Sequence, residues 1–491
     1  MSVKVYNTLS RRKEEFVPLH EGFVGMYVCG PTVYGHSHLG HAKSYVSFDV
    51  IIRHLRYLGL KVLYVQNITD VGHLLGDTNE GEDRVLMQSR MERKHPMEVA
   101  EEYTRSYFQD MDALNVLRPD ICPRASGHVI EQIDIVRLLI EKGYAYEING
   151  SVYFDVLKFP GYGKLSGRKV DEMEAGARVE VKSEKRNPAD FALWKKAEPE
   201  HIMQWPSPWG VGFPGWHIEC SAMSTKYLGP TFDIHGGGLE NQFPHHECEI
   251  AQSEGASGKP FVKYWLHNNM VTVNGQKMGK SLGNFTTLKQ AFEKWRPPVI
   301  RFFILQSHYR STLDFSDAAI DGAAGGLDRL TNAIRQLKKQ SVAGSAHSPG
   351  LSIDLAAIRR SFLEAMDDDF NTPQALAILF ELSRVVNAQL NQAGALDAQQ
   401  ARDALALMEE LGGGILGIDF QEDRKQNGLE AGLMDVIIEL RKDLRAEKLW
   451  KYSDRIRDAL NRLGIAIEDE KEGTSWRIVS STTGSPSSDG A

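Results

Sequence analysis

The first part of the chain alternates between short apolar segments and one stretch of helical periodicity. Residues 23–28 are apolar and β-prone and stop at residues 29–31, which predicts a buried strand that runs into a loop. From about His41, apolar positions recur at helical spacing until Gly59, which predicts a helix and its end. Residues 62–65 are typical of a second strand. We therefore expect a βαβ unit, a parallel sheet, and a site at the carboxyl ends of its strands.

Further along, the pattern separates several regions. A polar, charged region between about residues 75 and 205 interrupts the sheet pattern and is interpreted as an insertion; the sheet is expected to resume near residues 229–235. Residues 341–350 are small and polar, as in a linker. The apolar runs at 376–386 and 434–449 then predict a helix-rich block. The length of 491 residues suits about three domains.

Composition narrows the class of protein. The chain is 42% hydrophobic and 25% charged, and it contains no apolar run near the roughly 20 residues that span a membrane. Its polar amino terminus predicts no secretory signal, and four irregularly spaced cysteines predict a reducing, cytoplasmic location rather than a disulfide framework.

Net charge limits how the chain could bind nucleic acid. A net charge of −8 argues against indiscriminate binding, which depends on neutralising phosphates, although it leaves room for a local basic face. Basic residues recur between 441 and 462, interleaved with acidic ones. A nucleic-acid face and a solvated helix face explain this stretch equally well. Its members are Arg441, Lys442, Arg445, Lys448, Lys451, Arg455, Arg457 and Arg462.

A first short signature, His38-Leu39-Gly40-His41, lies where the first loop becomes a helix. Backbone N–H groups and the helix dipole favour anions there, so ATP phosphates would suit the position. Gly40 would let the nucleotide approach the backbone, and the two imidazoles could donate to phosphate oxygens in the transition state. Taken alone, the string could equally be two exposed histidines at a helix start.

A second signature, Lys277-Met278-Gly279-Lys280-Ser281, follows an Asn-Gly turn in a glycine-containing loop. Lys277 and Lys280 could close over a triphosphate and tighten at the reacting phosphorus. Taken alone, the string could be an exposed lysine turn. In this order and on this scaffold, however, the two strings resemble the HIGH and KMSKS pair of class I aminoacyl-tRNA synthetases. The family's usual third residue is Ser, whereas here it is Gly279.

Metal-binding residue types occur at several places. His245 and Glu249 are four apart and would share one face of a helix, which makes half of a zinc site or a structural pair. Cys29 ends the first strand, and Cys220 lies in a separate segment. Spacing alone does not indicate whether these residues meet.

Longer motifs resemble the cysteinyl-tRNA synthetase family in particular, and the similarity extends from about residue 4 to Arg477. In that family the residues matching Cys29, Cys220, His245 and Glu249 bind one zinc ion, while Cys248 and Cys122 match no ligand and are expected to pack. Thr69 and Trp216 match positions around the bound amino acid. The motifs that carry the resemblance are residues 27–34, 67–71, 215–221, 233–238, 243–247 and 367–373.

The resemblance implies a two-step reaction. The carboxylate of L-cysteine attacks the α-phosphorus of ATP to give cysteinyl-adenylate, and a ribose hydroxyl of tRNA(Cys) then attacks the activated carbonyl. His38, His41, Lys277 and Lys280 would act electrostatically, and Mg²⁺ would accompany ATP. Zinc would select cysteine over serine and alanine, because the serine hydroxyl is far less acidic than a thiol and alanine has no donor atom to coordinate the metal.

The resemblance also predicts further contacts, while the oligomeric state does not follow from the sequence. ATP is expected to contact Gly40, Lys280 and the residues Gly236, Gly237 and Gly238. Glu240 stands where the family usually has Asp, so an adenosine contact there stays open. We nevertheless expect the active species to be a monomer with no membrane association.

The same resemblance implies a domain order. A Rossmann-like α/β catalytic domain carries an inserted connective domain, and an α-helical anticodon-binding domain follows. The predicted spans are 1–120 and 206–265 for the two halves of the catalytic domain, 121–205 for the insertion, 266–340 for the second signature and stem contacts, 341–353 for a linker, 354–479 for the anticodon-binding domain and 480–491 for a disordered tail.

Two other functions compete. A related ligase that joins activated cysteine to an amino sugar would share the zinc site and both signatures, but it has little use for the carboxyl-terminal block. A catalytically dead tRNA-binding relative would have no reason to keep the signatures and all four metal positions.

Overall fold

The computed structural model divides into two compact units, Met1–Phe420 and Gln421–Ala491, and each is described by itself. The ranges described are 2–73, 83–168, 184–199, 201–279, 284–343, 354–393, 395–421, 429–470 and 473–478. Lys280, residues 344–353 of the expected linker and the expected tail at 480–491 lie outside these ranges.

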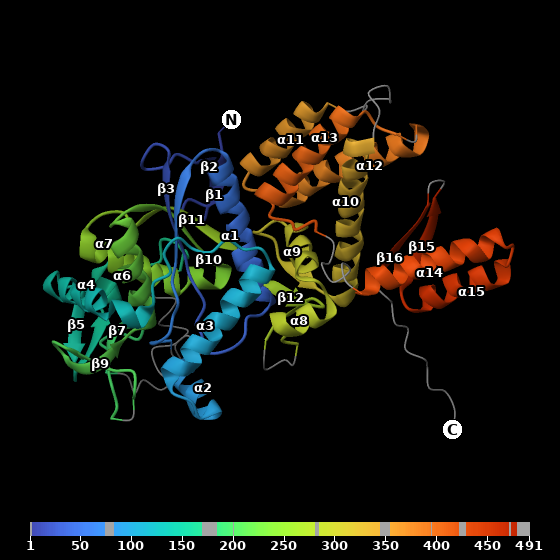
Figure 1. Cartoon of the computed structure of the whole chain (residues 1–491). Coiled ribbons are helices and arrows are strands. Elements are labelled where there is room, and N and C mark those ends of the chain that lie inside the picture. The colour runs from blue at the N-terminus through green and yellow to red at the C-terminus, as the bar shows by residue number, and fades with distance from the viewer. Residues whose placement is uncertain are drawn as a thin grey trace. The chain divides into compact units, whose positions relative to one another are not determined.

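A parallel four-stranded sheet organises the first unit (Figure 1). Its strand order is β11-β10-β3-β4, and every neighbouring pair is parallel. Helix α1 connects β3 to β4, so the predicted βαβ unit and Rossmann-like fold are confirmed. Gly59 follows the helix with φ of 87°, a backbone conformation that glycine adopts without strain. The bounds are Phe23–Val28 for β3, Leu39–Tyr57 for α1, Lys61–Gln66 for β4, Phe232–Gly238 for β10 and Val262–Asn268 for β11.

Both faces of the sheet are covered, which explains why β3 is apolar throughout. Val24, Met26 and Val28 belong to the core shared with α1, whereas Tyr27 and Cys29 belong to a second core shared with α6. Side chains alternate between the two faces of a strand, and here both faces are dry. Cys29 therefore faces helix α6 (Trp216–Leu228), which packs on α7 (His245–Ser257).

The insertion lies between β4 and β10 and contains its own antiparallel sheet. Its five strands have the order β5-β6-β7-β9-β8, and β9, the last of them along the chain, ends at Pro214. Isolated bridges from Val65 to Ile121 and from Ile68 to Arg124 bring the chain back along β4. The bounds are Arg84–Glu92 for α2, Pro96–Ala113 for α3, Ala125–His128 for η2, Val129–Glu141 for α4, Ala145–Ile148 for β5, Ser151–Phe154 for β6, Val156–Lys158 for η3, Phe191–Lys196 for β7, Trp205–Ser207 for β8 and Gly210–Pro214 for β9.

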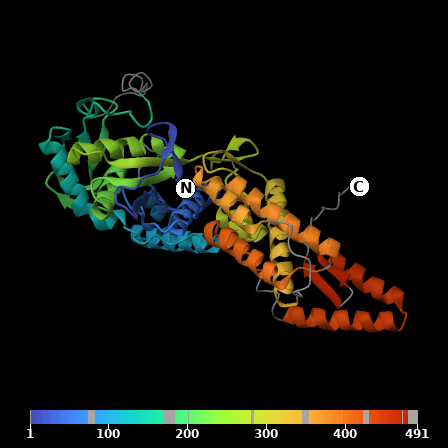
Figure 2. The ribbon, with the colours of Figure 1, turned by 90° about the horizontal axis from the view of Figure 1, so that it is seen from above.

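The rest of the first unit packs around the parallel sheet. A hairpin, β1 and β2, precedes β3; a small sheet of β12, β13 and β14 follows β11; and helices α10–α13 gather into one group (Figures 1 and 2). The bounds are Lys4–Asn7 for β1, Arg12–Glu15 for β2, Leu239–Gln242 for η4, Val271–Val273 for β12, Gln276–Lys277 for β13, Leu288–Lys294 for α8, Pro297–Leu305 for α9, Leu313–Phe315 for β14, Asp317–Ala343 for α10, Leu355–Asp367 for α11, Thr372–Ala393 for α12, Ala398–Met408 for α13 and Glu409–Ile415 for a π-helical turn.

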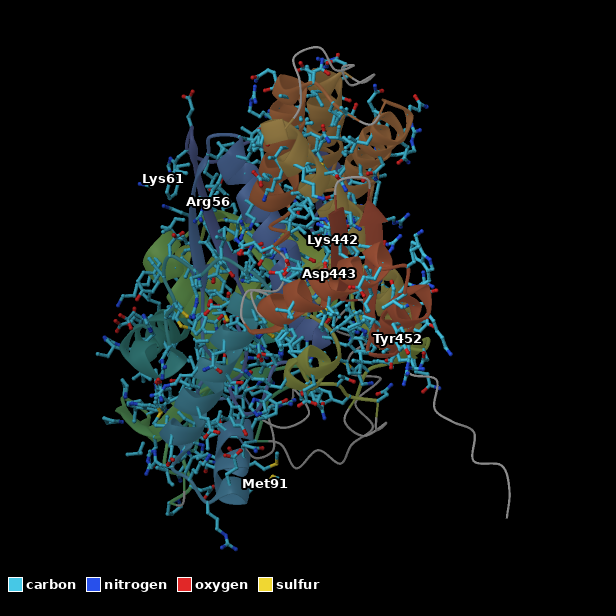
Figure 3. The ribbon with its side chains drawn as sticks, turned by 45° about the vertical axis from the view of Figure 1, so that its right-hand side comes forward. Arg56, Lys61, Met91, Lys442, Asp443 and Tyr452 are labelled. Carbon is cyan, nitrogen blue, oxygen red and sulfur yellow. The ribbon has the colours of Figure 1, made fainter. Side chains whose placement is uncertain are left out.

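The second unit pairs two helices with a hairpin that the helical pattern did not predict. The strands β15 (Ile465–Glu470) and β16 (Gly473–Ile478) are antiparallel. Lys442 and Asp443 lie on α14 (Leu429–Ala446), and Tyr452 lies on α15 (Trp450–Arg462) (Figure 3). The basic stretch is not one solvated face, because Arg441 is only 3% exposed.

Among the residues that the structure describes, no helix combines the length and the apolar character that crossing a membrane requires.

Candidate metal centre and nucleotide site

The four residues that the resemblance singled out as metal ligands come together. One ligand atom from each of Cys29, Cys220, His245 and Glu249 lies within 4.8 Å of every other. Cys29 follows the end of β3, Cys220 lies in the early part of α6, and His245 and Glu249 begin α7 and share one of its faces. His245 Nε2 is 3.1 Å from Glu249 Oε1. Three chain segments far apart in sequence thus meet at the carboxyl end of β3.

A second set of donors overlaps the first. Cys29 and Glu249 also lie within the same 4.8 Å limit of His235 and His246. His246 Nε2 is 3.2 Å from Cys29 Sγ, and His235 Nε2 is 2.8 Å from Glu249 Oε2. Sequence analysis assigned no role to these two histidines. The available signal was the recurrence of histidine in the segments that end β10 and begin α7.

The charges in the centre depend on one another. Burial favours the neutral form of Glu249, but the neighbouring His235 and His245 outweigh burial and lower the pKa of Glu249 to about 2. Burial likewise opposes charge on His245, yet Glu249 and Cys220 raise its pKa to about 10. Burial raises the pKa of the Cys29 thiol and raises that of Cys220 far above its usual range.

This donor set fits a zinc ion. Zinc prefers four ligands of the thiolate, imidazole and carboxylate types, and all three types are present within the distance limit. His245 Nδ1 lies 2.9 Å from His217 Nδ1, so the ring nitrogen that faces away from Glu249 also has a partner. A dication would favour the thiolate forms that burial alone disfavours.

Trp216 stands beside this centre. Its ring lies 4.2 Å from the His245 ring on one side and stacks at 4.0 Å on His73 on the other. His73 Nδ1 is in turn 2.6 Å from Thr32 Oγ1. Thr69 is buried, pairs with Thr32 through an isolated bridge, and accepts a hydrogen bond from Asn67 Nδ2 at 3.0 Å. Trp216 and Thr69 therefore lie at the same strand ends as the metal cluster.

His38 and His41 form a stacked pair at the start of α1. Their ring centroids are 3.9 Å apart. The backbone N–H of Gly40 donates to His38 Nδ1, and that of His38 donates to His41 Nδ1. Because each Nδ1 accepts, the proton of each neutral ring belongs on Nε2, which can then donate to an anion. Burial, with His38 nearby, lowers the pKa of His41 well below its usual range, so this ring stays neutral.

The second signature lies against the first. A Cβ on Gly40 would come 3.7 Å from Met278 Cε and only 2.9 Å from His38 Cε1, so a side chain there would crowd the signature's own histidine. Lys277 is exposed at the end of β13. Asn284 braces the loop: its Oδ1 accepts from Gly279 N at 2.9 Å, and its Nδ2 donates to Lys277 O at 3.1 Å. Lys280 is not among the described residues.

Helix α1 and the residue before its N-cap hold the two ends of this loop. Upstream of the loop, buried Lys43 donates to the carbonyl oxygens of Met270 and Ser311. Downstream of it, Leu288 N donates to Ser37 O at 2.7 Å. Burial lowers the pKa of Lys43 to about 8. The two signatures are thus parts of one assembly.

The three glycines of β10 have neighbours of their own. A Cβ on Gly236 would meet the Phe48 ring at 2.5 Å, and one on Gly237 would meet His246 Cε1 at 2.7 Å. A Cβ on Gly238 would meet the carboxylate of Glu240 at 2.7 Å. The missing side chains therefore let α1 and α7 pack closely on β10. Their predicted contact with ATP stays a prediction.

Comparisons with known proteins identify the family of this chain. Residues 15–325 match the family "tRNA synthetases class I (C) catalytic domain", residues 361–421 match "DALR domain", and residues 433–477 match "Cysteinyl-tRNA ligase anticodon binding domain". Among solved structures, methionyl-tRNA synthetase of Mycobacterium tuberculosis aligns with a TM-score of 0.57 over 83% of this chain and 96% of its own, at 14% identity. That likeness concerns the fold alone.

Curated relatives are much more similar in sequence. The cysteine--tRNA ligase of Chlorobium chlorochromatii is 55% identical across 97% of this chain and 100% of its own length. That of Chlorobaculum tepidum is 57% identical across 97% of this chain and 99% of its own. With its catalytic and carboxyl-terminal family matches and these full-length relatives, the chain belongs to the cysteine--tRNA ligase family of class I aminoacyl-tRNA synthetases.

Proposed function

We propose that this protein ligates L-cysteine to tRNA(Cys) at the expense of ATP, by way of cysteinyl-adenylate. The observation that carries this proposal is the convergence of Cys29, Cys220, His245 and Glu249 within 4.8 Å, at the same edge of the sheet as the start of α1. Family membership supports the overall reaction. The metal cluster supports the choice of substrate, because a soft thiolate suits zinc better than an alcohol does.

Cys29, Cys220, His245 and Glu249 would hold one Zn²⁺, which when bound would favour the thiolate form of the substrate. The chain's own residues would do the rest of the selection. Trp216, held between the rings of His73 and His245, would offer the edge of its indole as a pocket wall beside the small side chain. Buried Thr69 offers a hydroxyl to the amino group. A larger amino acid would clash with the wall, and serine or alanine would lack the thiol.

Activation would take place at the paired signatures. The Nε2–H groups of His38 and His41 and the amino terminus of α1 would stabilise negative charge on the phosphates. Lys277, and Lys280 further along the loop, would add positive charge as pyrophosphate leaves. Gly40 and residues 236–238 would line the nucleotide, and Mg²⁺ would accompany ATP. No side chain needs to act as a nucleophile.

Transfer would follow on tRNA. We propose the domain order expected from the sequence, in which the carboxyl-terminal block binds the anticodon, and we propose in addition that the insertion supports the acceptor end. The match of residues 433–477 to an anticodon-binding family supports the role of the carboxyl-terminal block. All the candidate site residues belong to one chain, so a monomer would be sufficient.

Aminoacylation with cysteine tests this proposal. Purified protein should charge tRNA(Cys) and should leave a small amine acceptor such as glucosamine unmodified. Charging of the amine in preference to tRNA would favour the amino-sugar ligase. Failure to make the adenylate, measured as pyrophosphate exchange into ATP, would favour a catalytically dead tRNA-binding protein.

A further inference from the structure

A polar hollow of about 360 Å³ lies beside the end of β11. None of the residues that line it has a role in the proposed activation of cysteine. Its walls come from the β1–β2 hairpin (Tyr6, Thr8 and Arg11), from η4, from the end of β11 and from Arg310. Ser166 of the insertion completes the wall. The volume falls within the range of roughly 300–1,000 Å³ typical of small-ligand sites, so one nucleotide would fit.

The lining is cationic. Arg11 and Arg310 are among its residues, and it contains no aspartate or glutamate from the described part of the chain. Arg310 is held in place, because its Nε donates to Asp369 Oδ2 at 2.7 Å and its guanidinium stacks over Tyr6 at 4.3 Å. Fixed guanidinium groups suit phosphate oxygens, which accept several N–H bonds from one planar fork.

Arg11, the second arginine of this hollow, is exposed. Its side chain makes no hydrogen bond or ion pair with the residues that the structure describes. The guanidinium lies over Gly167, and a Cβ on that glycine would overlap Nη2 of Arg11. The absence of a side chain at Gly167 therefore makes room for Arg11 between the hairpin and the insertion.

The hollow lies next to the end of β10. Leu239 and Gln242, on its wall, belong to η4, which directly follows the glycines that end that strand. His267, also on its wall, lies 2.8 Å from His246 Nδ1, and His246 Nε2 is 3.2 Å from Cys29 Sγ. Two histidine rings thus separate the hollow from the metal cluster.

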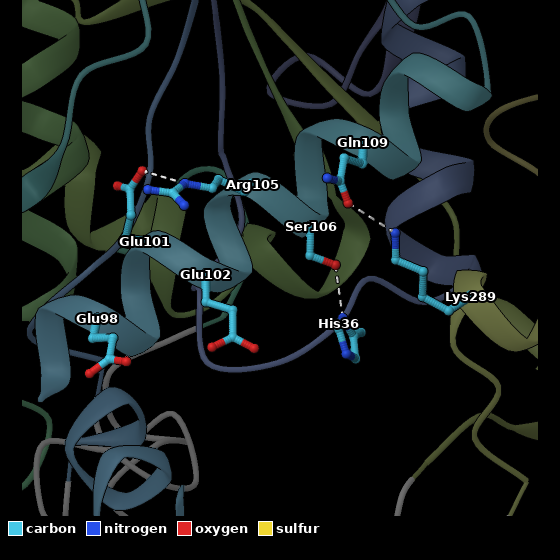
Figure 4. Close-up of a pocket in the computed structure, with 8 residues that line it drawn as sticks. All are labelled: His36, Glu98, Glu101, Glu102, Arg105, Ser106, Gln109 and Lys289. Atoms are coloured by element: carbon cyan, nitrogen blue, oxygen red, sulfur yellow. Dashed lines mark hydrogen bonds and ion pairs between the residues drawn. The ribbon is translucent and has the colours of Figure 1, made fainter. Parts of the chain in front are cut away.

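A second hollow, of about 490 Å³, offers the opposite chemistry. Glu98, Glu101 and Glu102 on α3 line it, with Arg105 already bonded to Glu101 and Lys289 directed at Gln109 (Figure 4). Three carboxylates would repel a phosphodiester. Of these two hollows, only the one at Arg11 suits the terminal phosphates of an RNA strand.

We propose that the hollow at Arg11 and Arg310 binds the 3′-terminal nucleotide of the tRNA during transfer, with the two guanidinium groups on the oxygens of its phosphodiester. This proposal rests on the proposed function. It predicts that the hollow contributes to transfer and not to adenylate formation, which needs no RNA.

Arg11→Gln tests the proposal, and Lys13→Gln is its matched control. Lys13 lies on the same hairpin and pairs with Asp368 at 2.7 Å, but it does not line the hollow. In aminoacylation, Arg11→Gln should raise KM for tRNA about tenfold. The slope of log affinity for tRNA against log salt concentration should fall by the equivalent of about one phosphate contact. Arg11→Lys should recover part of the lost affinity. Pyrophosphate exchange should change less than about twofold in these variants, and the control should resemble the wild type in both assays.

An acceptor-stem minihelix makes the test specific for the RNA end. As a competitor of charging, a minihelix with an intact CCA end should outcompete one without it by about tenfold on the wild type, but by much less on Arg11→Gln. Equal preferences in the two proteins, an unchanged KM for tRNA, or an equal loss of exchange and transfer would overturn the proposal. Absence of exchange in the wild type would instead overturn the proposed function.

Discussion

The metal cluster and the paired signatures lie at one sheet edge but are built differently. Cys220, His245 and Glu249 are at most 2% exposed, and their donors come from helices packed on a fully covered sheet. Lys277, in contrast, is exposed on a two-residue strand. Discrimination between two similar substrates needs donors held rigidly in a dry site, whereas phosphate chemistry needs a loop that ATP can reach and pyrophosphate can leave.

The largest effect should come from removing a ligand of the buried metal cluster. Cys220→Ser replaces a thiolate ligand by a much less acidic hydroxyl, so zinc content should fall to a small fraction of the wild-type value. Cysteine-dependent pyrophosphate exchange should fall by about a thousandfold or more. Elemental analysis and the exchange assay measure the two losses.

Cys122→Ser is the matched control for this variant, because Cys122 is exposed and lies outside the cluster. It should keep both zinc and exchange. Wild-type zinc content in Cys220→Ser would mean that Cys220 is not a ligand, and the set with His235 and His246 would then become the better candidate.

A smaller effect should come from changing a lysine of the exposed second signature. Lys277→Ala should lower kcat for pyrophosphate exchange by about a hundredfold while KM for cysteine changes less than about threefold, because the lysine acts on the leaving phosphates rather than on the amino acid. Lys294→Ala, an exposed lysine on α8 paired with Asp317, should leave both values near wild type. Equal losses in kcat and in cysteine affinity would contradict a transition-state role for Lys277.

The smallest effect should come from Lys43, a buried lysine on helix α1 beside the two signatures. Its pKa of about 8 lies below the value of about 10.4 in an unfolded chain, so the folded protein releases this proton first as the pH rises. Between pH 8 and pH 9 the unfolded state then binds more protons, and the free energy of unfolding should rise by about 1 kcal/mol relative to Lys43→Met.

Urea unfolding of both proteins across this pH range measures the difference. Parallel curves would show that burial does not lower the pKa of Lys43 in the folded protein.

Periodicity predicted the fold where each local pattern had one interpretation. Residues 23–28 and the run from His41 to Gly59 give β3 and α1 because a covered parallel strand is apolar on both faces and a crossover helix keeps a helical stripe. The hairpin of β15 and β16 was missed because its alternating apolar positions, Ile465 with Ile467 and Trp476 with Ile478, number only two per strand and are separated by polar residues such as Glu468 and Asp469.

The site was harder to predict than the fold. Cys29 and Cys220 are distant in sequence, and only the packing of α6 and α7 on β3 brings them together. Lys43 looked like an ordinary helix lysine, since its partners are backbone carbonyls that carry no sequence signal. Family resemblance supplied the ligand set where physical spacing could not.

The most direct test of the central claim compares amino acids in pyrophosphate exchange, with zinc measured on the same preparation. If the buried cluster selects the substrate and the signatures only activate it, the protein should contain about one zinc per chain and exchange with cysteine at least about a thousandfold faster than with serine or alanine. Comparable exchange with serine by zinc-loaded protein would contradict this account.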